Sequence, residues 1–378
     1  MPARGESMAT FAFLQHTFSA PSVRGWIEGL EAGGHRGIVV IATERLSHED
    51  WSGLTVEVLP DLEWTRRVAR RIAPSRSKHV LAFPDPVALR RLLRRHGVDV
   101  VVVKVYSLRN VVASLVALTL RARRLSWSEQ VPPLSLEWRL LRAIGALPRR
   151  RFAALAARPG GVALPDAEQA LGVPVLSYTP PRGTRNVERR PEPEDRVRFL
   201  TVAAWKNAVA KRQWRTLEAA AAAGLLDGRA TFTFVGVGGP GDEGYVRTAA
   251  LVEELGVGHL VELRCDVPHE EMTAVMDAHD VLVLPSVREQ FGMVVPEAMT
   301  RGLAVVTTAA VGAVGLVDPG RTGLVVDPED IPGLGAAMRR FVDEPGLAAR
   351  MGAEGGTFVE RWASPAHAGP TLERLALG

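Results

Sequence analysis

Cysteine, lysine and tyrosine are scarce in this chain of 378 residues, which has one cysteine, four lysines and three tyrosines. The single cysteine, Cys265, cannot form a disulfide within the chain, so a disulfide-rich scaffold is excluded and a cytoplasmic location is expected. The longest apolar stretch, Val98 to Leu120, is interrupted by Asp99, Lys104 and Arg109. It is too short and too charged to span a bilayer. Residues 1–7 lack the apolar core of a secretory signal.

Three further absences narrow the possible functions. The sequence has no Asp-x-Asp run and no His/Cys cluster at ligand spacing, so we expect no metal site. Gly-x-Ser-x-Gly is also missing, which argues against a hydrolase that uses that motif. Aromatic residues do not alternate with the arginines, as a base-stacking platform would require, so nucleic acid is not an expected partner.

Charge is distributed unevenly along the chain. Residues 1–190 carry a net charge of +13 and residues 191–378 a net charge of −9, and nearly all of the basic residues are arginines. Four of these arginines fall in the helical stretch 90–95. Two interpretations remain open. The basic half either contacts anionic lipid at a membrane surface or an anionic acceptor, or it presents an ordinary solvated helix face.

Short apolar runs alternate with helical stretches in both halves, which predicts βαβ units and parallel sheets. In the first half, residues 98–103 are typical of a buried strand and residues 110–124 of the helix that follows. Residues 179–195 are rich in proline and charge, which is typical of a linker. The sequence thus predicts an α/β protein of two Rossmann-like domains facing a cleft, over residues 1–180 and 197–362, joined by a linker at 181–196.

Two glutamates, Glu289 and Glu297, follow the apolar run 281–284, and seven residues separate them. The run predicts a buried parallel strand, Gly292 allows close backbone approach, and Pro296 can open a helix. At the carboxyl end of a strand, the amides of a helix N-terminus favour phosphate oxygens. A carboxylate can accept hydrogen bonds from neighbouring hydroxyls. This combination suits a nucleotide-sugar.

Three segments resemble the retaining glycosyltransferases of the GT-B fold, specifically family 4. The run from Ala278 to Met299 is similar to the family's "ADV-x-x-x-PS-x-x-E-x-F-G…EA" block. The stretch from Gly312 to Asp330 resembles its "G-x-tG-x-LV-x-p-x-D" ending, and residues 235–240 resemble its "vG-x-Gp" turn. The resemblance extends over about residues 197–345. It implies that a last helix, over residues 363–378, returns to the first domain.

For the donor, the resemblance implies that Glu297 binds the ribose hydroxyls and that Glu289 binds the hydroxyls of the sugar. The amides of Phe291, Gly292 and Met293 would face the sugar and the distal phosphate. The remaining donor candidates are the cations Lys211, Lys206 and Arg212, the tight turn at Gly238, and the base-reading segment at Val267.

One departure concerns these phosphate-binding cations. The family pattern "G-R-x-x-x-x-K-G" places Lys211 at its lysine, but Ala203 and Ala204 stand at its Gly-Arg pair. Lys206 or Arg212 is the candidate for the missing charge, with a solvated loop cation as the alternative for each.

The acceptor side departs more from the family. Polar residues at predicted strand ends are the candidates, and the alternative for each is a satisfied polar residue at a strand terminus. They are His16, Lys104, Tyr106, Glu129 and Gln130. Of these, Glu129 and His16 are also candidate catalytic groups, together with Glu289.

The resemblance implies a retaining, metal-independent glycosyltransferase that needs no cofactor and uses a nucleoside-diphosphate sugar of the UDP or GDP type. The absence of a clear amphipathic anchor favours a small natural product as acceptor. Three alternatives remain: a lipid-linked or polysaccharide acceptor at a membrane, a nucleotide-sugar epimerase, and a degenerate relative that binds nucleotide-sugars without catalysis. The epimerases carry a different glutamate and histidine pattern, which is not seen here.

Overall fold

A computed structural model describes residues 8–14, 20–42, 53–72, 82–104, 108–128, 152–155, 175–176, 196–289 and 291–378. The described residues pack into two compact units. Unit 1 contains the residues up to Leu155, the short strand Val175–Leu176 and the last segment, Ala363–Gly378. Unit 2 contains the residues from Arg196 to Trp362. Each unit is described below by itself.

Unit 1 is built on a seven-stranded sheet in the order β3-β2-β1-β4-β5-β6-β7, and its neighbouring strands run parallel. The strands are β1 (Thr10–Leu14), β2 (Arg36–Ile41), β3 (Thr55–Val58), β4 (Val100–Lys104), β5 (Arg123–Ser128), β6 (Phe152–Leu155) and β7 (Val175–Leu176). The valines of β4 and all of β1 apart from Thr10 are almost completely inaccessible to solvent. Continuous apolar runs of this kind are typical of strands that helices cover on both faces.

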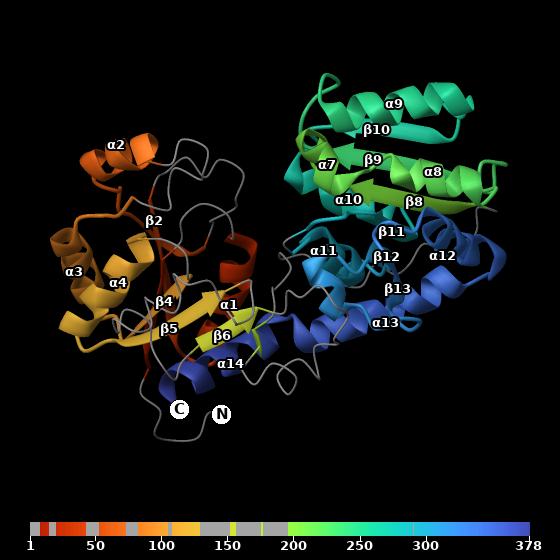
Figure 1. The fold of residues 1–378 in the computed structure, drawn as a ribbon. Helices are drawn as coiled ribbons and strands as arrows, with labels where there is room; N and C mark the ends of the chain where they lie inside the picture. Colours follow the sequence, from red (N-terminus) through yellow and green to blue (C-terminus); the bar gives the residue numbers. More distant parts are fainter. Residues whose placement is uncertain are drawn as a thin grey trace. The chain divides into compact units, whose positions relative to one another are not determined.

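The helices of unit 1 connect these strands, as Figure 1 shows. They are α1 (Ala20–Ala32), α2 (Glu63–Ile72), α3 (Pro86–Arg95) and α4 (Leu108–Thr119), with α14 (Pro365–Leu377) from the end of the chain. The predicted helix over residues 110–124 was too long. Arg121 adopts a left-handed φ of 57°, and the Ala122 amide donates to the Ala117 carbonyl at 3.0 Å, so the chain turns and enters β5.

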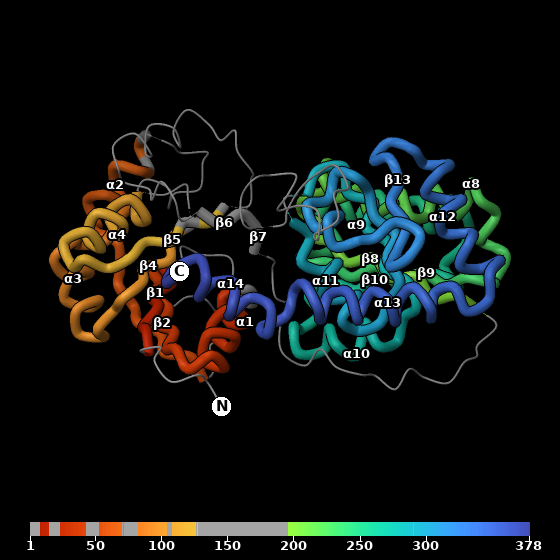
Figure 2. Tube along the Cα trace, turned by 90° about the horizontal axis from the view of Figure 1, so that it is seen from below, coloured from red at the N-terminus to blue at the C-terminus, as the bar shows by residue number. Residues whose placement is uncertain are grey.

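Helix α14 packs along α1 through two glycines, and both views show these helices side by side (Figures 1 and 2). A Cβ atom on Gly29 would lie 2.1 Å from the Pro365 carbonyl oxygen, and one on Gly369 would lie 2.2 Å from the Gly29 carbonyl oxygen. His35 Nε2 also approaches Glu373 Oε1 at 3.3 Å. The last helix therefore belongs to the packing of unit 1, although most of that unit precedes residue 156.

Unit 2 has a six-stranded parallel sheet in the order β10-β9-β8-β11-β12-β13. The strands are β8 (Val197–Val202), β9 (Ala230–Gly236), β10 (Val261–Cys265), β11 (Val281–Leu284), β12 (Ala304–Thr308) and β13 (Gly323–Val326). Phe199 and Phe232 stack across β8 and β9 with their ring centroids 5.5 Å apart. Two parallel α/β units confirm the predicted fold class. The cleft between them stays a prediction.

The helices of unit 2 cover this sheet. They are α7 (Ala208–Lys211), α8 (Arg215–Ala222), α9 (Glu243–Leu255), α10 (Met272–Asp277), α11 (Val294–Thr300), α12 (Ile331–Asp343) and α13 (Leu347–Trp362), with short 3-10 turns η1 (Trp205–Asn207), η2 (His269–Glu271) and η3 (Gly312–Leu316). In the described part of the chain, no helix is both long and apolar enough to cross a membrane.

The strand order of unit 2 places a topological switch point between β8 and β11. The chain leaves β8 toward β9 on one side, whereas β11 is followed by β12 on the other side. In open parallel sheets, the two loops that leave such a pair of strands diverge, and ligands bind at the carboxyl ends between them. The loop after β8 carries Lys211 and the loop after β11 carries Glu289. The fold therefore brings the two loops to one edge of the sheet.

Candidate donor site

Strand β11 positions Glu289 through a fixed loop. The strand is buried along its whole length. Beyond it, the Glu289 amide donates to the Ala310 carbonyl at 3.2 Å, and the Gly312 amide donates to the Glu289 carbonyl at 3.1 Å. Because these bonds tie the loop to the chain that follows β12, the glutamate has a defined backbone position at the edge of the sheet. Its side chain is 15% exposed.

Lys211 and Glu289 form an ion pair, with Lys211 Nζ in contact with Glu289 Oε2. The lysine ends α7, and its side chain is 16% exposed. A backbone bond joins the same two loops, because the Val287 amide donates to the Ala210 carbonyl at 2.9 Å. Burial lowers the pKa of Lys211, and the adjacent carboxylate acts in the opposite direction by favouring the charged ammonium. The sheet thus brings together two of the residues that the sequence predicted for the donor.

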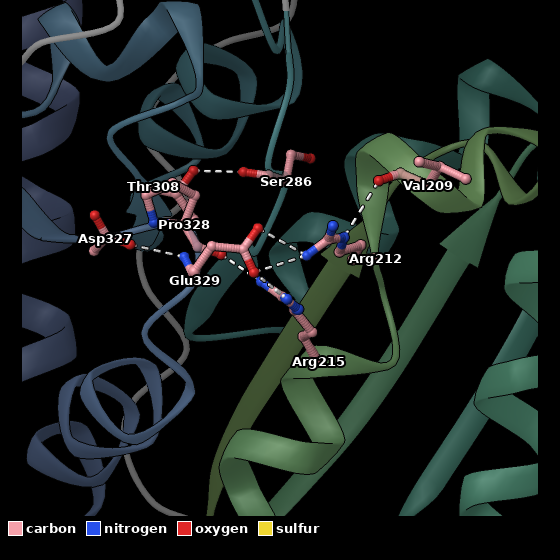
Figure 3. A network of polar contacts seen from close by, with 8 residues as sticks. All are labelled: Val209, Arg212, Arg215, Ser286, Thr308, Asp327, Pro328 and Glu329. Carbon is pink, nitrogen blue, oxygen red and sulfur yellow. Dashed lines mark hydrogen bonds and ion pairs between the residues drawn. The ribbon is translucent and has the colours of Figure 1, made fainter.

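Arg212 occupies the position where the family pattern has glycine. It adopts a left-handed backbone conformation, which glycine adopts more readily than other residues. Its φ and ψ are 46° and 48°, the left-handed region, at the C-terminal cap of α7. Its guanidinium is bound elsewhere: Arg212 Nη1 lies 2.9 Å from each carboxylate oxygen of Glu329, which Arg215 also contacts at 2.5 Å (Figure 3). The Arg212 guanidinium is thus paired with a carboxylate that it shares with Arg215 in this structure. Its role at a diphosphate stays a prediction.

The turn from Phe291 to Met293 leads directly into α11. Gly292 has a φ of +89°, and a Cβ there would lie 3.0 Å from Val311 Cγ1, so glycine suits both the conformation and the space. Among the residues that the structure describes, none accepts a hydrogen bond from the amides of Gly292, Met293 or Val294. These amides therefore have capacity for an anion, and their contact with a sugar or a phosphate stays a prediction. The helix begins at Val294, and Pro296 lies in its first turn.

Glu297 lies in the first turn of α11, where the sequence placed it. The residue keeps some solvent access, yet protein atoms surround its carboxyl closely. The resulting desolvation raises the pKa of Glu297 to about 7. No side chain in the described ranges donates a hydrogen bond to this carboxyl group. A carboxylate that is poorly solvated in the free protein would gain from ribose hydroxyls that donate to it.

The turn after β9 is stabilised by the protein itself. The Gly238 amide donates to Asp266 Oδ1 at 2.9 Å, and the Gly239 amide donates to Asp242 Oδ2 at 2.8 Å. Gly238 has a φ of +119°, and a Cβ there would clash with the Asp242 carboxylate. These glycine amides are used within the fold, so the turn is a tight structural turn. Val267 follows β10 on the same edge and is partly exposed.

The segment after β8 is apolar where the family pattern has a glycine and an arginine. Ala203 is buried, and Trp205 is completely buried, with its ring nitrogen 3.3 Å from the Arg264 carbonyl oxygen. Gln213 bridges back to this segment by donating to the Ala204 carbonyl at 3.0 Å. Lys206 is exposed in η1. Of the three predicted cations, Lys211 is the one that the structure places beside a predicted acid.

Most of the predicted acceptor residues lie outside the described residues. These are His16, Tyr106, Glu129 and Gln130. Lys104 ends β4, the strand beside β1, and nothing is described of its side chain. Strands β1 and β4 form the switch point of the first sheet, so the loops after them leave the same edge. The acceptor residues stay predictions.

Glu329 and Arg215 were missed by the sequence reasoning. Glu329 lies about 120 residues after α7 and is part of a turn in which its amide donates to Asp327 Oδ1 at 2.9 Å. No local pattern connects an acid after β13 to an arginine after β8, because only the strand order makes them neighbours. Another missed contact links two strand ends, since Thr308 Oγ1 donates to the Ser286 carbonyl at 2.5 Å (Figure 3).

Comparison with known families supports this description. Residues 183–357 match the family model of glycosyl transferases group 1. Unit 2 belongs to the glycosyl transferases group 1 family. The resemblance seen in the sequence is thereby confirmed for this domain. The match does not extend over the residues of unit 1 that precede position 156.

Several curated proteins named D-inositol 3-phosphate glycosyltransferase are similar to this part of the chain. The D-inositol 3-phosphate glycosyltransferase of Streptomyces avermitilis is 36% identical over 119 residues, which are 31% of this chain and 26% of the relative. The protein of that name from Thermobifida fusca is 30% identical over 191 residues, which are 49% of this chain and 43% of the relative. The matched part thus spans less than half the length of these relatives.

Solved structures share the fold over nearly the whole chain. A glycosyltransferase from Rickettsia africae has a TM-score of 0.70 at 14% identity and covers 98% of this chain and 99% of its own. HepE from Anabaena, solved in complex with UDP, has a TM-score of 0.65 at 16% identity, with 97% and 98% covered. These likenesses agree with two parallel α/β units.

Proposed function

We propose that the chain is a retaining, metal-independent glycosyltransferase that moves a sugar from a nucleoside-diphosphate sugar to an acceptor held by unit 1. The observation that carries the proposal is the ion pair between Lys211 and Glu289 at the switch point of the second sheet. Two opposite charges, both mostly buried at the ligand-binding edge, suit a ligand that is anionic at one end and rich in hydroxyls at the other.

Each residue has a role in this proposal. The Lys211 ammonium moves from Glu289 to the diphosphate, where a point charge stabilises the oxygens that gain charge as the sugar leaves. The Glu289 carboxylate, once released, accepts hydrogen bonds from sugar hydroxyls. Glu297 binds the ribose hydroxyls, and the amides of Gly292 and Met293 face the distal phosphate.

The transfer itself breaks the bond between the anomeric carbon and the phosphate oxygen. A bond to the acceptor oxygen forms on the same face of the sugar. The departing phosphate takes the acceptor's proton, so that no protein base is needed. Glu129 is the candidate to assist that proton transfer, and His16 is the other candidate catalytic group on the acceptor side.

The nucleotide in this proposal is UDP or GDP. HepE, which shares the fold, has been solved with UDP and with UDP-glucose. The acceptor has two candidate classes, a small natural product and a lipid-linked or polysaccharide acceptor at a membrane. The family match lies in the donor unit, so it favours neither class.

The test is incubation of the full chain with a panel of UDP-, GDP- and ADP-sugars, with release of the free nucleotide as the readout. Hydrolysis of one donor, lost in Lys211→Gln and retained in Lys206→Gln, is the expected result. The competing proposal is a degenerate protein that binds nucleotide-sugars without catalysis, favoured by Ala203 and Ala204 at the expected Gly-Arg pair. Thermal stabilisation by a nucleotide without turnover of any donor or acceptor would favour that protein over the enzyme.

A further inference from the structure

Helix α2 presents a mixed apolar and basic face to solvent. Trp64 is 55% exposed and Val68 is 43% exposed, and Arg67 and Arg71 are exposed beside them. These four positions follow the i, i+3, i+4, i+7 spacing of a single helix face. On the opposite face, Thr65 and Ala69 are buried. The large apolar side chains are therefore on the outer face of a helix that already has a buried face.

The base under this face is rigid. The completely buried Arg109 donates to Asp61 Oδ1 at 2.7 Å, and it also contacts the Leu59 carbonyl, just before α2. The Leu62 amide donates to the Phe83 carbonyl at 3.0 Å, which fixes the start of α2 to the start of α3. The Trp64 ring meets the Phe83 ring edge-on at 5.7 Å. Trp64 is thus held in an exposed position by ordered neighbours.

Helix α3 also exposes apolar and basic side chains. Val87, in the first turn of α3, is 56% exposed, and Arg90, Arg91 and Arg94 follow it as exposed side chains. Figure 1 shows α2 and α3 (both orange to brown) at the periphery of unit 1. The exposed acid on α2 is Glu63, and Asp85 caps α3 by accepting from the Val87 amide at 2.8 Å. Arginines therefore outnumber acids on these two helices.

We propose that the outer face of α2, defined by Trp64, Arg67, Val68 and Arg71, docks on an anionic lipid bilayer. Trp64 and Val68 would enter the boundary between headgroups and acyl chains, which is where tryptophan is favoured. The guanidinium groups would bind lipid phosphates, and each arginine near an anionic surface adds to the attraction. An apolar anchor combined with arginines fits this partner better than it fits nucleic acid, which would leave Val68 unused.

This inference deepens the proposed function, on which its last step rests. The sequence favoured a small soluble acceptor because it showed no amphipathic anchor. Helix α2, which the sequence did not predict, supplies one. A unit that binds acceptor while it sits on a bilayer has lipid-linked acceptors in reach, so the surface favours that class.

The experiment is co-sedimentation of the full chain with vesicles of phosphatidylcholine alone or with an equal part of phosphatidylglycerol. We expect binding to the anionic vesicles that weakens as salt is added. Arg67→Gln with Arg71→Gln should reduce partitioning roughly thirtyfold, as expected for two arginines near an anionic surface. Trp64→Ser with Val68→Ser should also reduce it. The matched control, Val246→Ser with Arg350→Gln on exposed helix positions of unit 2, should bind like the parent chain.

Equal sedimentation of the parent and both α2 variants would overturn the proposal, as would equal binding to neutral vesicles. A preference for an oligonucleotide or an acidic protein over vesicles would overturn it as well. Melting curves check that the variants fold. Because these side chains are exposed, we expect the substitutions to leave the fold intact. Donor hydrolysis measured without lipid reports on the proposed function separately, so failure of one result does not imply failure of the other.

Discussion

Lys211 and Glu289 neutralise one another across the carboxyl ends of β8 and β11, although 77 residues lie between them. Each was predicted to contact a different part of the same ligand. In the free protein they therefore satisfy one another, which removes the penalty of leaving a mostly buried charge without a partner. A donor that replaces both contacts must separate the pair. The measured affinity for the donor therefore includes the free energy needed to separate this ion pair.

The first prediction separates the two roles by comparing a nucleoside diphosphate with its sugar conjugate. Lys211→Gln should weaken binding of both ligands by roughly tenfold, because each contains the diphosphate. Glu289→Gln should weaken binding of the sugar conjugate only. It should leave the diphosphate bound as well or better, since Lys211 is then free. Titration calorimetry measures all four affinities, with Lys206→Gln as the control. Equal losses for both ligands in Glu289→Gln would contradict these roles.

The second prediction concerns Glu297 and pH. Its folded pKa of about 7 lies above the ordinary value of 4.5. Between these two values the folded protein binds a proton that the unfolded chain has lost, so stability falls as pH rises from 4.5 to 7 and levels off above that. Glu297→Gln removes this slope. The variant should therefore gain melting temperature relative to the parent as pH rises toward 8.

Nucleotide affinity should show the opposite trend. Ribose hydroxyls donate to the ionised carboxylate, so the affinity of the parent chain should rise with pH through 7, whereas that of Glu297→Gln should stay low and flat. Calorimetry at pH 5.5 and pH 8 distinguishes the two variants. An identical pH dependence of affinity in parent and variant would remove Glu297 from the nucleotide site.

The third prediction asks what Arg212 does. Its left-handed backbone costs about 1 kcal/mol in a residue with a side chain, and its pair with the exposed Glu329, which solvent screens, offsets part of that cost. Arg212→Gly should therefore change the free energy of unfolding little, while Arg212→Ala keeps the strain, loses the pair and should be less stable. Urea denaturation compares the two. If Glu329 holds the guanidinium permanently, nucleotide affinity stays unchanged in both; a tenfold loss in both would show that Arg212 moves to the phosphate.

The sequence was most informative for β11 and the residues that directly follow it. The burial of β11, the left-handed Gly292 and the position of Glu297 all follow from residues within one short segment. Pro296 lies in the first turn of the helix, as expected, but the pattern does not determine which residue of that turn comes first. Local patterns identify such a segment well and its exact boundary less well.

Long-range partners could not be predicted from the same patterns. Glu329 pairs with Arg212 and Arg215 because β13 and β8 belong to the same sheet, which no local pattern encodes. The exposed face of α2 was missed for a related reason. The sequence of α2, with four arginines and one tryptophan, does not indicate which side of the helix is buried. The burial of Thr65 and Ala69 in the folded unit identifies that side.

The last prediction tests how α14 is joined to unit 1. A Cβ at Gly29 or Gly369 would meet backbone atoms of the other helix at 2.1–2.2 Å, and backbone cannot rotate away as a side chain can. Gly369→Ala should therefore force α1 and α14 apart and destabilise unit 1 by about 1–3 kcal/mol. The matched control is Gly258→Ala in unit 2, where the nearest atom lies 3.9 Å away. Thermal unfolding should show a lower transition for Gly369→Ala and little change for Gly258→Ala. Nucleotide affinity should be unaffected in both variants, since the donor residues lie in unit 2. An unchanged transition in Gly369→Ala would mean that the close glycine contact does not hold the helices together.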